Sequence, residues 1–175
     1  MDNVLTLRLM IVAALFFLGC SWFFYLLLNR ELDKQRDLTF EAVTVIKVVD
    51  GDTLKVRMAD GMIEKVRLIG IDCPESVHPD AFRNSKEGFY ASRFTQSLVT
   101  FGDVVYLQKD ISDRDKYDRL LRYVWLEYTE DFDDKEEARN KMLNARILIN
   151  GFARVSTYEP DTYYEDIFKA LSKCF

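Results

Sequence analysis

The chain has 175 residues, of which 49% are hydrophobic, and this is the size of one ordinary domain with room for a short appendage. Its formal net charge of −5 excludes a protein that binds nucleic acid through a uniformly basic surface, although a local basic site is compatible with it. The hydrophobic content predicts a packed core rather than a disordered chain.

Carboxylates dominate the potential metal ligands. The sequence has one histidine, His78, and its three cysteines lie far apart at positions 20, 73 and 174. Sites with several histidine ligands and zinc sites with closely spaced cysteines are therefore excluded within one chain. The 29 Asp and Glu residues suit hard cations such as Ca²⁺ and Mg²⁺ instead.

The N-terminal segment predicts a membrane anchor. After a short tail (residues 1–8), residues 9–28 form a run of twenty residues without a charge. As a helix this run is about 30 Å long, which matches the hydrocarbon core of a bilayer. A cleavable signal peptide usually has a shorter apolar stretch, so an uncleaved single-pass helix is the favoured interpretation. Residues 29–40 are expected to link it to a folded domain over residues 41–175.

Alternation of apolar and polar residues predicts five short strands in that domain. Asp-Gly pairs at 50–51 and 60–61 are typical of tight turns and separate the first three strands. The strands are expected near residues 43–49, 53–58, 63–69, 104–107 and 120–126.

Helical spacing predicts three helices. Gly151 stands where a left-handed C-terminal cap is expected after the second helix, and Asp161 or Thr162 is expected to cap the third. An acidic run at residues 127–137, with seven acids in eleven residues, is expected to be a solvated loop. The helices are expected at residues 85–99, 138–150 and 163–173.

These elements predict an α+β fold. Five short strands with one helix between the third and the fourth fit a five-stranded OB-type Greek-key barrel. The full expectation is such a barrel with about three helices, preceded by one N-terminal transmembrane helix.

Three short motifs carry the candidate chemistry. They are DGDT at residues 50–53, RLIGIDCPE at residues 67–75 and DKYDR at residues 115–119. Asp52 and Asp72 are carboxylates at adjacent strand ends, and such a pair can bind a hard cation. An acidic residue at a strand end is more often simply solvated, so each motif alone is weak evidence for a functional site.

The same motifs supply groups for phosphate chemistry. Arg67 and Arg119 offer planar donor forks that match phosphoryl oxygens. Glu75 follows Pro74, which stiffens the chain around it. Together these residues indicate a site for a phosphate ester.

In this order the motifs resemble those of the staphylococcal nuclease (thermonuclease-like) family, whose pattern is DGDT, then R-x4-D-x-P-E, then D-x-Y-x-R. The resemblance runs from about Val43 to Lys173. It implies a calcium-dependent endonuclease on an OB-type barrel, which hydrolyses phosphodiester bonds of DNA, RNA or both.

The resemblance also implies roles for individual residues. Asp52 and Asp72 match metal-binding carboxylates, and the main-chain carbonyl of Cys73 would complete the metal shell. Glu75 matches the residue credited with positioning or activating the attacking water. The phosphate-binding arginines are matched by Arg67 and Arg119, and the substrate-contacting positions by Lys116, Tyr117 and Tyr158.

Two departures from the family's pattern bear on substrate binding. Asp118 stands where a glycine is common and adds a negative charge beside Arg119. Asp80 and Ala81 stand where some members carry lysines that attract polynucleotide. Together with the acidic run at 127–137, these departures predict weaker and more salt-sensitive capture of nucleic acid.

Three alternatives to the calcium-dependent enzyme remain. Cys73 would act as a nucleophile in the first, although no histidine follows it in a convincing position. The second is a catalytically weak or inactive OB-fold module that binds nucleic acid at the membrane. In the third the barrel only binds a protein partner. The five residues that calcium-dependent hydrolysis needs are all present, and this favours the nuclease. They are Asp52, Arg67, Asp72, Glu75 and Arg119.

Partners and location follow from the same observations. We expect a DNA or RNA substrate, attachment to the membrane through residues 9–28, no protein partner and a monomer. Lys and Arg on the two flanks of residues 9–28 lean slightly toward a cytoplasmic domain. Calcium is scarce in cytosol and plentiful outside cells, so the extracytoplasmic side is expected instead.

Overall fold

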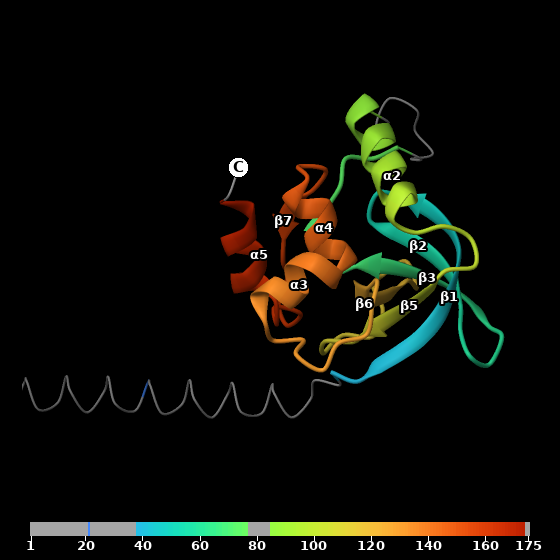
Figure 1. The fold of residues 1–175 in the computed structure, drawn as a ribbon, viewed down its shortest axis with the longest axis horizontal. Coiled ribbons are helices and arrows are strands. Elements are labelled where there is room, and N and C mark those ends of the chain that lie inside the picture. The colour runs from blue at the N-terminus through green and yellow to red at the C-terminus, as the bar shows by residue number, and fades with distance from the viewer. Residues whose placement is uncertain (1–20, 22–37, 77–84, 174–175) are drawn as a thin grey trace, which may run out of the picture. The chain divides into compact units, whose positions relative to one another are not determined.

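The computed structural model describes Ser21, residues 38–76 and residues 85–173 (Figure 1). Apart from Ser21, the predicted anchor at residues 9–28 lies outside the described residues, and so does His78. Within the described residues, no helix has both the length and the apolar character needed to cross a membrane.

Five strands close into a barrel, which confirms the expected α+β fold with a five-stranded barrel. The order around the barrel is β1-β2-β3-β6-β5, and only the β3–β6 pair is parallel. The bounds of the strands are β1 (Phe40–Asp50), β2 (Thr53–Arg57), β3 (Ile63–Leu68), β5 (Val104–Gln108) and β6 (Leu120–Trp125).

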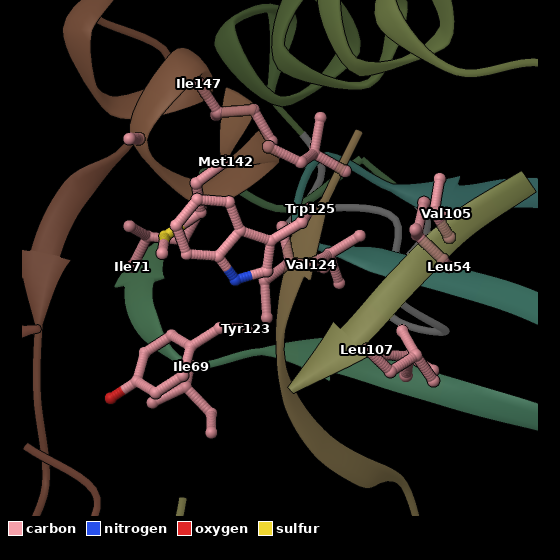
Figure 2. Close-up of a cluster of buried hydrophobic side chains, with 14 of the residues drawn as sticks. Leu54, Ile69, Ile71, Val105, Leu107, Tyr123, Val124, Trp125, Met142 and Ile147 are labelled. Carbon is pink, nitrogen blue, oxygen red and sulfur yellow. The ribbon is translucent and has the colours of Figure 1, made fainter. Parts of the chain in front are cut away.

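The core of the barrel follows from the alternation in its strands. Val45, Leu54 and Val66 are fully buried, whereas Lys55 and Lys65, the neighbours of Leu54 and Val66, lie toward the outside. In β1 the register shifts between Val45 and Lys47, so Lys47 is exposed although it lies two positions from a buried residue. Trp125 and Met142 belong to the same buried cluster and form an isolated bridge (Figure 2). The core therefore continues from the barrel into the helical segment that follows β6.

Helix α2 (Lys86–Leu98) lies between β3 and β5 in sequence and packs against β1 (Figure 1). The Ser85 hydroxyl accepts a hydrogen bond from the Gly88 amide at 3.0 Å, so the helix begins as the sequence predicts.

The predicted helix at 138–150 is in fact two helices. Helix α3 (Lys135–Lys141) and helix α4 (Leu143–Ile149) are separated by Met142, which has an extended backbone. Asn144 holds the break against the barrel, because its side chain accepts from the Val124 amide at 2.9 Å and donates to the Ile69 carbonyl at 2.8 Å. Gly151 has φ 76, which confirms the expected left-handed cap.

The acidic run is only partly a loop, so this prediction needs correction. Asp134 caps α3 by accepting from the amides of Glu136 at 2.8 Å and Glu137 at 2.9 Å. Glu136 and Glu137 lie in the first turn, where negative charge favours the exposed N–H groups of a helix.

The third predicted strand ends early and a small second sheet follows it. Strand β3 stops at Leu68, and β4 (Gly70–Asp72) pairs antiparallel with β7 (Arg154–Ser156). Gly70 has φ 81, and an added Cβ would lie 2.7 Å from a ring carbon of Phe168. The chain can therefore turn here only with glycine.

The capping prediction for the last helix is wrong. Helix α5 (Glu165–Ser172) has Tyr164 at its N-cap and no side-chain cap. Asp161 instead accepts from the amides of Ile111 at 3.1 Å and Ser112 at 2.7 Å. It therefore fixes the connection between β5 and β6.

Candidate active site

Arg67 brings together the two carboxylates that the sequence singles out. From the outer face of β3, its Nη2 donates to Asp72 Oδ1 at 2.9 Å, and its Nη1 forms an ion pair with Asp52 Oδ2. Burial lowers the pKa of Arg67, and the negative charge of Asp72 opposes this shift. Because an arginine pKa starts far above neutrality, the guanidinium stays charged.

The two carboxylates suit a calcium ion. Both contact one guanidinium, so two anionic oxygen ligands face the same small region. Among the described residues, no cluster of three or more His, Cys, Asp or Glu side chains forms a metal site. Further ligands would have to be main-chain carbonyls, water or substrate oxygens, and calcium accepts all of these.

Arg119 reaches the same site through Thr53. Its Nη1 lies 3.5 Å from the Thr53 hydroxyl, which donates to Asp52 Oδ1 at 3.2 Å. The Arg119 side chain is itself held by Asp115, because Nε donates to Asp115 Oδ2 at 2.7 Å. A continuous polar network therefore joins Arg119, Thr53, Asp52 and Arg67.

Asp115 organises the loop before β6. Its Oδ1 accepts from the amides of Tyr117 at 2.9 Å and Arg119 at 3.0 Å. Burial acts to raise the pKa of Asp115, but these hydrogen bonds and the Arg119 charge outweigh it and hold the pKa below its usual range. Asp118 has φ 63 in this loop, a backbone conformation that glycine adopts at no steric cost.

A groove of about 610 Å³ lies beside the two arginines. Both Arg67 and Arg119 line it, as do all three predicted substrate-binding residues, Lys116, Tyr117 and Tyr158. Tyr117 and Tyr158 are 68% and 76% exposed, so their rings are accessible to a base, and the Lys116 ammonium and the Arg119 guanidinium lie 5.0 Å and 5.4 Å from the centre of the Tyr117 ring.

Glu75 is placed by its backbone rather than by its side chain. Its carboxylate is exposed and makes no hydrogen bond or ion pair with the described residues, while its carbonyl accepts from the Ser85 amide at 2.9 Å. Gly88 of α2 lies against the same carbonyl, where an added Cβ would also come within 2.7 Å of the Pro74 oxygen. The position of Glu75 therefore depends on the close approach of α2.

Cys73 contributes through its backbone. Its amide donates to Asp52 Oδ2 at 2.8 Å, and its side chain is buried. Burial raises the pKa of the Cys73 thiol to about 12, although the positive charge of Arg67 opposes the shift. A thiol that stays protonated at neutral pH is a poor nucleophile, and this opposes the cysteine alternative.

Sequence reasoning missed several residues that hold this site together. Arg154 of β7 binds Asp72, and Thr53 links Asp52 to Arg119. Asp50 accepts from the hydroxyls of Ser76 at 2.7 Å and Ser92 at 2.9 Å, and so joins the first turn to α2. Asp50, Thr53 and Asp115 lie within the three motifs and could have been found there. Arg154 lies outside them, and its partner Asp72 is 82 positions away in the sequence.

Comparisons with known proteins find relatives that are named as nucleases. A thermonuclease of Staphylococcus intermedius is 35% identical over 137 residues, which cover 78% of this chain and 73% of the relative. One from Staphylococcus hyicus is 34% identical, over 74% of this chain and 68% of the relative. The SPbeta prophage-derived endonuclease YokF of Bacillus subtilis is 38% identical, over 73% of this chain and 38% of the relative. Residues 65–173 match the family described as staphylococcal nuclease homologue, and the chain belongs to this family.

Proposed function

We propose that the chain is a calcium-dependent endonuclease that hydrolyses phosphodiester bonds of DNA, RNA or both on an OB-type barrel. The observation that carries the proposal is the position of Arg67 between Asp52 and Asp72. Nη1 forms an ion pair with Asp52 and Nη2 donates to Asp72, so one guanidinium holds both carboxylates at the same place. The relatives named as thermonucleases and endonucleases support a nuclease.

Calcium would be held by Asp52, Asp72 and the main-chain carbonyl of Cys73. When bound, the ion would neutralise phosphate charge and activate a water molecule. Glu75 would accept or orient the proton of the attacking water, because its exposed carboxylate is not engaged by the described residues.

The arginines would bind the phosphate and stabilise the charge that builds up at pentacoordinate phosphorus. Arg67 is preorganised by Asp52 and Asp72, and Arg119 by Asp115. Fixed donors need no reorganisation during the reaction, and this is the main source of such stabilisation. Lys116, Tyr117 and Tyr158 would bind the flanking nucleotide in the groove.

A nuclease assay on the full-length chain in a nonionic detergent tests the proposal. We expect cleavage with Ca²⁺ and none after chelation. Asp72→Asn should abolish calcium binding in calorimetry and lower kcat by at least about a hundredfold. Asp166→Asn, an exposed acid on α5, is the matched control and should behave like the wild type.

Other outcomes separate the alternatives. Undiminished cleavage under chelation would contradict the calcium mechanism. Binding of nucleic acid without any cleavage would favour the catalytically inactive binding module.

The membrane attachment is also a proposal. It rests on the uncharged run at residues 9–28, and it places the nuclease domain on the extracytoplasmic side, where calcium is plentiful. We further propose a monomer without a protein partner.

A further inference from the structure

The outer face of β1, β2 and β3 carries a row of three lysines. Lys47 pairs with Lys55 across β1–β2, and Lys55 pairs with Lys65 across β2–β3. Directly paired residues project from the same face of a sheet. The neighbouring pair Leu54 and Val66 is fully buried, so the lysines project outward side by side.

This row continues the candidate active site. Arg67 and Lys65 are two positions apart on β3 and therefore share its outer face, as Thr53 and Lys55 do on β2. Two residues of a strand span about 7 Å. The pair Lys55–Lys65 is therefore the next cross-strand pair after Thr53–Arg67 on this face. Arg57, in the pair after that, adds a further positive charge.

The positive charge in this row is not compensated. Like charges that are directly opposite in a sheet destabilise it. Within the described residues, Lys47, Lys55 and Lys65 form no ion pair. In contrast, Lys141 and Lys169 on the helices each pair with a glutamate one turn earlier. In a chain of net charge −5, such a concentration fits a polyanionic ligand.

We propose that Lys47, Lys55 and Lys65 form a basic track that binds backbone phosphates of a single-stranded polynucleotide beyond the scissile bond. This inference rests on the proposed nuclease function and adds that the preferred substrate is longer than the groove. We take the strand as single, because unpaired bases can stack on the exposed side chains of Tyr117 and Tyr158 in the groove.

The test compares a long and a short ligand. Fluorescence anisotropy with chelator present would measure binding of the full-length chain, in nonionic detergent, to a twenty-nucleotide oligothymidylate and to a trinucleotide. In the triple variant Lys47→Gln/Lys55→Gln/Lys65→Gln, the slope of log Kd against log salt should fall by about 2 for the long ligand, because each lost phosphate contact removes about 0.7. Its Kd at low salt should rise at least about tenfold, against about twofold or less for the trinucleotide.

A matched control removes the same charge elsewhere. Lys135→Gln/Lys169→Gln/Lys173→Gln lies on and next to α3 and α5 and should leave the long ligand's salt slope unchanged. Three results would overturn the track. The control variant could lose as much affinity as the triple lysine variant, or the triple lysine variant could lose equal affinity for the long and the short ligand. The wild-type protein could also bind a duplex more tightly than the single strand. If the wild-type chain cleaves nucleic acid and the triple lysine variant binds the long ligand as tightly as the wild type does, the basic track is overturned and the proposed function is not. A wild-type chain that neither binds nor cleaves the long ligand would overturn the proposed function as well.

Discussion

Arg154 donates two hydrogen bonds to Asp72 Oδ2 across the small β4–β7 sheet, from Nε at 3.1 Å and from Nη2 at 2.8 Å. Arg67 holds the other oxygen of the same carboxylate, so Asp72 lies between two positive charges. The Arg154 side chain is 81% exposed, whereas that of Arg67 is only 17% exposed. Arg154 is therefore the arginine that solvent can release when a cation binds Asp72.

Replacing Arg154 should tighten calcium binding. Arg154→Gln removes a charge that competes with the cation, and a solvent-screened pair of this kind is worth about 0.5–1 kcal/mol. Calorimetry should therefore give a calcium Kd about two- to fivefold lower, with a smaller gain at high salt. Arg139→Gln on α3 makes the same charge change away from the site and should have no effect. Weaker calcium binding by Arg154→Gln would instead mean that Arg154 holds Asp72 in its binding geometry.

Arg119→Lys should reduce kcat more than it raises KM. Lysine keeps the charge but loses the planar fork whose Nε and Nη2 both contact Asp115 Oδ2. Without this preorganised donor, we expect kcat to fall by about a hundredfold or more. Steady-state kinetics on a defined oligonucleotide measure both constants. A change confined to KM would show that Arg119 only gathers substrate.

Gly88→Ala tests whether the approach of α2 positions Glu75. An added Cβ would collide with the Glu75 carbonyl and lie 2.7 Å from the Pro74 oxygen, so the helix or the Glu75 segment must shift. Overpacking of this kind costs about 1–3 kcal/mol, which a thermal melt would register. We also expect kcat to fall beyond what the loss of folded protein explains. Ser97→Ala, at an exposed position of α2, is the control and should change neither quantity.

The barrel and the three motifs could be predicted because their signals are local. Alternation in β2 and β3 and the Asp-Gly turn at residues 50–51 are visible within a few residues. The break at Met142 could not be predicted, because the local spacing favours one helix. It is set by distant partners, namely the bridge to Trp125 and the hydrogen bonds of Asn144 to the barrel.

The same distinction applies to the site. Asp52, Arg67 and Asp72 carry recognisable motifs, but the sequence could not show that one guanidinium joins both carboxylates. Asp161 looked like a helix cap because it precedes a helical pattern. Tertiary structure gives its carboxylate better donors, the amides of Ile111 and Ser112.

Acid should destabilise the domain through Asp113 and Asp115. A hydrogen bond from Arg122 lowers the pKa of Asp113, and the hydrogen bonds from Arg119 and Tyr117 lower that of Asp115 against the effect of burial. Each carboxyl therefore binds its proton less readily in the folded than in the unfolded chain. Their contribution to stability is complete above the unfolded pKa of about 4 and is lost as the pH falls through the lower folded value.

Thermal melts across pH measure this effect. We expect Tm to stay level near neutrality and to decline below pH of about 4. Asp115→Asn should lower stability at neutral pH by about 1–2 kcal/mol and flatten the acid decline, because its charged acceptor is gone. Glu41→Gln, at an exposed position of β1, should keep the wild-type profile. An unchanged acid decline in Asp115→Asn would contradict the role given to this carboxyl.

The predicted anchor separates this chain from a freely secreted nuclease. Residues 9–28 are long enough to span a bilayer and carry no charge, so the full-length protein should stay in membranes after an alkaline carbonate wash, at its unprocessed mass. The double substitution Leu18→Arg/Gly19→Arg should release or destabilise it, since each charge costs about 2.5–3.5 kcal/mol at the centre of a spanning helix. Gln96→Arg/Ser97→Arg adds the same charge at exposed positions of α2 and should leave the protein in the membrane.

A protease added to intact cells tests the side of the membrane. Digestion of the barrel would place the nuclease domain outside the cell. A soluble, shortened form of the wild-type chain would show that residues 9–28 are a signal peptide instead.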